Sequence, residues 1–212
     1  MRKFMMVVGA VASMATASVA IAQDKAVASK SDVRGVQALQ SVGHCLADER
    51  MGWSQEFVTL NYRSDRYRTL GKRLIEYAPN CNEFSRGLRM SGLIFAGAIA
   101  EGLLIKEDVL SDLGAHIAFD PELPPVEAIT AEDVFAYCVV RKAPGEVSAL
   151  LQTKMTSDEE LEALKAMVGV LPTCVPEGQK PEFTREALRS LFALAAYRLH
   201  AHNLAHHSGS ET

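Results

Sequence analysis

Four cysteines are the residues of this chain whose chemistry is most constrained by their spacing. Cys45 and Cys81 are 36 residues apart, and so are Cys138 and Cys174. Thiols in an oxidising compartment form disulfides, and four thiols allow three pairings. A shift of 93 residues places the first pair on the second, which favours Cys45–Cys81 and Cys138–Cys174 as the two disulfides. Zinc is the alternative, but zinc sites use closely spaced pairs such as C-x-x-C, and none occurs here.

Two histidines near the end of the chain have the spacing of a metal chelate. His202 and His206 are four residues apart, so a helix places both imidazoles on one face, where they can bind a divalent ion. Alternatively, histidines near a helix C-terminus interact with the helix dipole and stay solvated. No acidic residue closely flanks the pair as a third ligand. We predict no cofactor and keep His202 and His206 as candidate metal ligands.

Basic side chains gather between residues 63 and 73, among tyrosines. The residues of this basic face are Arg63, Arg66, Arg68, Lys72 and Arg73. The corresponding stretch of the second half, which contains Asp158 and Glu162, is acidic. Three interpretations stay open: the basic face binds an anionic partner, the two stretches meet within or between chains, or both are ordinary solvated helix faces.

One carboxylate, Glu101, lies in the most apolar predicted helix, over residues 92–104. If it were buried, its pKa would rise and it could act as a general acid or base; more often such a residue points to solvent. Gly92, Gly97 and Gly102 in this helix would let another helix approach closely. The chain has no nucleophile elbow, phosphate-binding loop, dinucleotide fingerprint or H-E-x-x-H motif, so we assign no catalytic residue.

The shift of 93 residues also aligns residues of turns and helix caps, which indicates a duplicated unit. The identical pairs include Gly52 with Gly145, Ser64 with Ser157, Asp65 with Asp158, and Pro79 with Pro172. Apolar residues recur at helical spacing and no stretch alternates as a strand would. The sequence therefore predicts an all-α fold made by tandem duplication of a small bundle, with about four helices and one disulfide in each copy.

The expected organisation begins with a signal peptide at 1–22, because Arg2 and Lys3 precede a short apolar stretch and Ala20-Ile21-Ala22 offers a cleavage site after Ala22. A flexible lead-in at 23–31, a first repeat at 32–119, a linker at 120–129, a second repeat at 130–207 and a disordered tail at 208–212 follow. The apolar stretch is too short to favour a membrane anchor. We expect a periplasmic or secreted protein without a membrane span in the mature chain.

The second copy carries a run that is similar to a segment of known proteins. Cys138-Val-Val-Arg141-Lys-Ala-Pro144 precedes Leu150-Leu151-Gln-Thr153, Cys174 and a closing Tyr197-Arg198. This pattern resembles exported bacterial proteins of unknown function. The resemblance covers the second copy well and the first only in outline. It implies no activity, cofactor or catalytic residue.

Charge and motifs together favour a binding role over catalysis. The formal net charge of −4 argues against a nucleic-acid binder, which needs a dense basic surface. We expect a non-enzymatic binding or structural module of the cell envelope that engages an envelope protein or another anionic component. The alternatives are an enzyme with its site between the two repeats and a metal-binding protein that uses the C-terminal histidines.

Overall fold

The structure is a computed structural model that describes residues 30–76, 79–81, 92–179 and 181–207. The predicted signal peptide, the cleavage site after Ala22 and the tail at 208–212 lie outside the described residues. The α-helices are α1 (Lys30–Glu49), α2 (Met51–Thr59), α3 (Asp65–Glu76), α4 (Gly92–Lys106), α5 (Leu113–His116), α6 (Ala131–Lys142), α7 (Pro144–Leu151), α8 (Asp158–Ala166) and α9 (Arg185–His207). Within the described ranges there is no strand, so the all-α prediction is confirmed.

The order of helices repeats along the chain. In the first half α2, α3 and α4 begin at Met51, Asp65 and Gly92. In the second half α7, α8 and α9 begin at Pro144, Asp158 and Arg185, each 93 residues later. Short 3-10 turns, η1 (Pro79–Cys81) and η3 (Leu171–Cys174), occupy corresponding places after α3 and α8. This succession is consistent with a duplicated unit of four helices, with α5 and the 3-10 turn η2 (Val109–Asp112) between the copies.

The starts of α3 and α8 use the serine caps that the repeat aligns. The Ser64 hydroxyl accepts a hydrogen bond from the Tyr67 amide at 3.1 Å, and the Ser157 hydroxyl accepts one from the Glu160 amide at 3.2 Å. Such caps satisfy backbone amides that a helix start leaves without partners. One boundary differs from its prediction. The helix α1 begins at Lys30, inside the predicted lead-in at 23–31.

Both disulfides join the cysteines that the repeat pairs. Cys45–Cys81 ties α1 to η1, and Cys138–Cys174 ties α6 to η3. No cysteine of the chain is free. The pairing prediction is confirmed, and these thiols hold no zinc. No helix in the described part of the chain has the length and apolar character needed to cross a bilayer.

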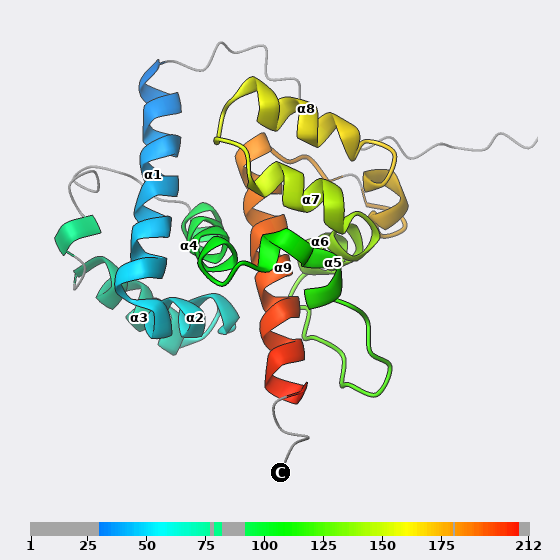
Figure 1. Cartoon of the computed structure of the whole chain (residues 1–212), viewed down its shortest axis with the longest axis horizontal. Coiled ribbons are helices and arrows are strands. Elements are labelled where there is room, and N and C mark those ends of the chain that lie inside the picture. Colours follow the sequence, from blue (N-terminus) through cyan, green and yellow to red (C-terminus); the bar gives the residue numbers. More distant parts are fainter. Residues whose placement is uncertain (1–29, 77–78, 82–91, 180, 208–212) are drawn as a thin grey trace, which may run out of the picture.

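The centre of the molecule is α4, which packs along α1 on one side and along α9 on the other (Figure 1). Small residues allow the close approach that the sequence predicts. A Cβ added at Gly97 would lie 2.4 Å from the Ser190 Cβ of α9, and one at Gly43 of α1 would lie 2.5 Å from the Ala98 Cβ of α4. A single apolar core runs through both halves, so the two copies share one interior.

We predict that Gly97→Ala destabilises the protein by about 1–3 kcal/mol, because the added methyl group overpacks the contact between α4 and α9. Urea unfolding followed by circular dichroism measures the change. Gly52→Ala in α2 is the control, since a Cβ there meets nothing within 4 Å. Helix propensity alone favours alanine at both positions. A Gly97→Ala protein as stable as the control variant would contradict the close-packing argument.

Candidate functional site

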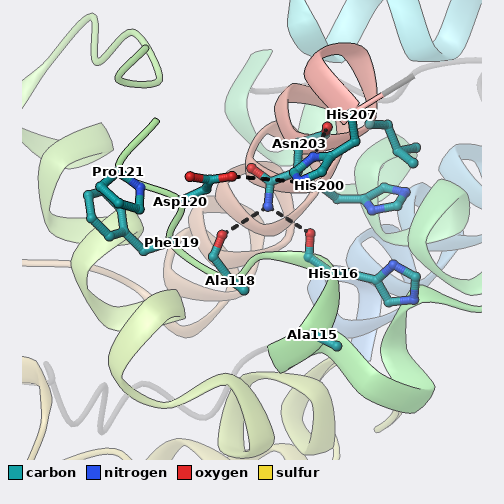
Figure 2. A pocket seen from close by; sticks show the side chains of 10 residues that line it. Ala115, His116, Ala118, Phe119, Asp120, Pro121, His200, Asn203 and His207 are labelled. Atoms are coloured by element: carbon teal, nitrogen blue, oxygen red, sulfur yellow. Dashed lines mark hydrogen bonds and ion pairs between the residues drawn. The ribbon is translucent and has the colours of Figure 1, made fainter. Parts of the chain in front are cut away.

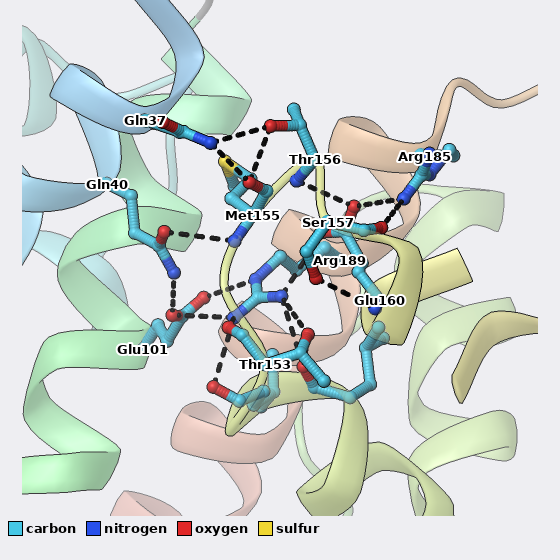
Figure 3. A network of polar contacts seen from close by, with 12 residues as sticks. Gln37, Gln40, Glu101, Thr153, Met155, Thr156, Ser157, Glu160, Arg185 and Arg189 are labelled. Carbon is cyan, nitrogen blue, oxygen red and sulfur yellow. Dashed lines mark hydrogen bonds and ion pairs between the residues drawn. The ribbon is translucent and has the colours of Figure 1, made fainter. Parts of the chain in front are cut away.

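The guanidinium of Arg189 is a fully buried charge, and its side chain is 0% exposed. It projects from α9 toward α4, where it pairs with Glu101 through two hydrogen bonds (Figure 3). Arg189 Nε donates to Glu101 Oε2 at 2.8 Å, and Nη2 donates to Oε1 at 2.9 Å. This two-pronged geometry matches the shape of a carboxylate and is the strong form of the ion pair.

The remaining donors of Arg189 bind the end of α7 and the start of α8. Nη2 donates to the carbonyls of Leu151 at 3.0 Å and Thr153 at 2.8 Å, while Nη1 donates to the carbonyl of Leu150 at 3.0 Å. Nη1 also reaches Glu160 Oε1 at 3.2 Å. The carbonyls at a helix end carry partial negative charge. Arg189 therefore caps α7 and satisfies its own buried donors in the same contacts.

Glu160 lies in the first turn of α8, where Ser157 is the cap, and it also binds residues outside this helix. Its carboxylate accepts a hydrogen bond from the Thr156 amide at 3.0 Å and pairs with Arg185 at 2.9 Å as well as with Arg189. Thr156 has a φ of 66°, which is unfavourable for a β-branched residue. Its hydroxyl also accepts a hydrogen bond from Gln37 of α1 at 3.0 Å. The network thus holds a strained turn in place (Figure 3).

The expectation that Glu101 points to solvent is wrong, because this residue is 1% exposed. Gln40 donates to it and His44 lies 3.1 Å from it, both from α1. Burial raises the pKa of Glu101, but the hydrogen bonds and charges of His44 and Arg189 outweigh burial and hold this pKa below its ordinary value. The predicted rise on burial is therefore also wrong. Glu101 is therefore a structural anchor whose carboxylate is ionised at neutral pH.

A second arginine of α9 repeats this arrangement on the first copy. Arg198 Nε donates to the Val58 carbonyl at 2.8 Å, and Nη2 donates to the Leu60 carbonyl at 3.2 Å, both at the end of α2. After a shift of 93 residues, residues 58 and 60 correspond to residues 151 and 153, whose carbonyls accept hydrogen bonds from Arg189. Arg198 also lies 3.4 Å from Asp133, the acid of the α6 capping box. One helix therefore caps equivalent ends in both copies.

An apolar cavity of about 570 Å³ lies at the seam between the two halves. Small-molecule sites commonly have volumes of about 300–1,000 Å³. Here it is called the seam cavity. Its lining residues are Tyr62, Tyr67, Gly92, Leu93, Ala96, Thr130, Glu132, Asp133, Phe183, Leu191, Leu194 and Arg198. Glu101 is not among them, so the predicted alternative site between the repeats has no catalytic carboxylate from α4.

A second hollow, of about 460 Å³, lies beside the C-terminal half of α9 (Figure 2). Asn203 donates to the carbonyls of His116 at 3.1 Å and Ala118 at 3.0 Å, which fastens this segment to α9. His200 lies 3.2 Å from Glu107, which holds the ring in place. The described lining includes no serine, cysteine or lysine that could act as a nucleophile.

The predicted metal ligands lie close together but are differently exposed. The rings of His202 and His206 are 4.5 Å apart. Burial lowers the pKa of His202, against a backbone hydrogen bond to Pro124 that raises it. Its Nε2 is buried without a hydrogen-bond partner, while His206 is exposed. Among the described residues no group of three or more histidines, cysteines or acids could hold a metal.

The basic face occupies α3 and the turn before it, and all five of its side chains are exposed. Arg66 forms two hydrogen bonds with Glu56, at 2.6 and 3.0 Å, and Arg68 pairs with Asp65. Lys72 and Arg73 make no ion pair with any described residue. The acidic counterpart on α8 lies on the opposite side of the molecule (Figure 1). The two charged faces therefore do not meet within one chain.

Comparison with known proteins adds no assignment, because no protein family, curated protein or solved structure matches this chain.

We predict that the ion pair of Glu101 makes stability depend on pH. Because its pKa is lowered by folding, its contribution is complete above the ordinary value of 4.5 and is lost as pH falls through the folded pKa. Glu101→Gln should lower the free energy of unfolding by about 1–3 kcal/mol at neutral pH and flatten its decline below pH 4.5. Urea unfolding at several pH values measures both effects. The exposed Glu162→Gln is the control, and an equally steep pH dependence in both variants would contradict the assignment.

Metal binding by His202 and His206 stays a prediction with its own measurement. If the pair binds a divalent ion, protein purified without metal-affinity resin contains about one equivalent of metal, because two imidazoles on one helical face chelate it. His202→Ala should then lose the metal, and His207→Ala should retain it. Elemental analysis of the three proteins decides the matter. A metal-free wild-type protein would rule this function out.

Proposed function

We propose that the chain is a non-enzymatic, exported binding module of the cell envelope that engages an anionic partner through the basic face of α3. The observation that carries this proposal is a contrast in accessibility. Glu101, the candidate acid or base, is sealed behind Arg189, whereas every side chain of the basic face is exposed. Catalysis requires reacting groups that substrate can reach, and binding requires an open, charged surface.

The two disulfides support the assignment to an exported protein, because such bonds persist in oxidising compartments such as the periplasm. The rigid attachment of α3 supports a role in recognition. Tyr67 of α3 stacks on Phe57 of α2 with ring centres 4.2 Å apart, and Leu70 and Leu74 are buried beneath the helix. A charged face on a fixed helix loses little conformational entropy on binding.

Within the basic face, Lys72 and Arg73 are the residues on which partner binding depends most. Arg66 and Arg68 are already paired with Glu56 and Asp65, so a partner would have to compete for them. Lys72 and Arg73 have no such competitor among the described residues. Thr69 is exposed and lies three residues after Arg66 and four before Arg73, hence on the same helical face.

We predict that a photo-crosslinking amino acid at Thr69 captures a partner in the native envelope, because this position is at the centre of the basic face. Lys72→Glu/Arg73→Glu should abolish the adduct, since it reverses the two uncommitted charges. Denaturing electrophoresis and mass spectrometry of the adducts measure the result.

The matched control is Arg34→Glu/Lys154→Glu, which makes the same change in net charge at exposed positions outside α3. It should leave the adduct intact. Equal adduct yields from the two double variants would refute partner binding by the basic face.

A further inference from the structure

The seam cavity has walls that are fixed by aromatic stacking on both sides. On the side of the first copy, Tyr67 is held by its stack with Phe57. On the side of the second copy, Phe183 stacks on the buried Phe135 with ring centres 5.4 Å apart. A cavity whose walls are already ordered can accept an apolar ligand without a large entropic cost.

Most of the lining is aliphatic or aromatic. Leu93 and Ala96 of α4 face Leu191 and Leu194 of α9 across the seam. Of the polar lining residues, Asp133 and Arg198 are 8% and 7% exposed and are committed to each other and to helix ends. They are therefore not available to hold a polar ligand, and the interior of the seam cavity suits an apolar chain.

Two exposed charges of opposite sign lie at or next to residues that line the cavity. Next to Tyr62, the guanidinium of Arg63 lies 5.7 Å from the centre of the tyrosine ring. On the side of α6, the exposed Glu132 contributes a carboxylate to the lining. An anionic group bound at the rim of the cavity is attracted toward Arg63 and repelled by Glu132.

We infer that the seam cavity binds a free amphiphile with one aliphatic chain and an anionic head, of which a fatty acid is the simplest example. The chain lies between α4 and α9, and the head lies at the rim beside Arg63. The two proposed sites share Arg63, but partner binding is tested at Lys72 and Arg73 and the cavity at Ala96, so either proposal can fail without the other.

The probe for this inference is cis-parinaric acid, a fatty acid whose fluorescence increases in an apolar site. We expect saturable binding to the full chain and displacement by palmitate. Ala96→Phe fills the cavity and should weaken binding at least about tenfold. Val168→Phe is the matched control, because Val168 is 49% exposed and does not line the cavity. Circular dichroism melting verifies that each variant is folded.

Two surface variants test the head group without affecting the core. Arg63→Gln should weaken palmitate binding about two- to fivefold, and Glu132→Gln should strengthen it by a similar factor, as expected for exposed charges. Monopalmitin, which has the same chain and a neutral head, should bind both variants and the wild type equally. Palmitate should still displace parinaric acid from the Lys72→Glu/Arg73→Glu protein.

Several results would overturn the inference. One is the absence of saturable parinaric acid binding, and another is binding that a folded Ala96→Phe protein retains in full. Palmitate affinities that neither charge variant changes would refute the anionic head. The last measurement uses vesicles that contain phosphatidylglycerol. If the protein sediments with these vesicles but does not bind free palmitate, it attaches to a membrane surface and the proposed amphiphile site is wrong.

Discussion

The buried ion pair between Arg189 and Glu101 is the interaction on which the rest of the structure depends. A guanidinium without exposure to water must find acceptors for all its N–H groups, or its burial costs several kcal/mol. The acceptors come from α4, from the end of α7 and from the start of α8. Only one arrangement of these helices supplies them together. The pair therefore selects a packing more than it adds to stability.

The helix α9 extends this principle to both copies. It presents Arg189 to α7 and Arg198 to α2, at carbonyls that the internal repeat makes equivalent. The corresponding helix of the first copy, α4, has Ala96 and Ile105 at the positions that match these arginines. The two halves thus share the same order of helices, while one helix, α9, caps equivalent ends in both. Small residues on α4 complete the arrangement, because they let α1 and α9 approach its backbone.

Sequence patterns predicted the features that depend on local signals or on exact recurrence. Cysteine spacing predicted the disulfides, and Ser64 and Ser157 marked the starts of α3 and α8. The network at Glu101 was not predicted, because Arg189 meets Glu101 across 88 residues and no short motif links them. A signal did exist: Arg189 lies three residues before Phe192, on the apolar stripe of its helix. The exposure of the basic face could be predicted from the helical spacing of α3. The pairing of Arg66 with Glu56 could not, because it depends on the turn between α2 and α3.

The position of α9 in the chain has a consequence for the order of assembly. It follows the other described helices in the chain, yet it caps the carbonyls at the end of α2 and covers one apolar side of α4. The N-terminal half cannot reach its final packing until α9 is in place. Its disulfide can close early, as Cys45 and Cys81 belong to the same half. The first half can therefore be covalently linked by its disulfide before α9 completes its packing.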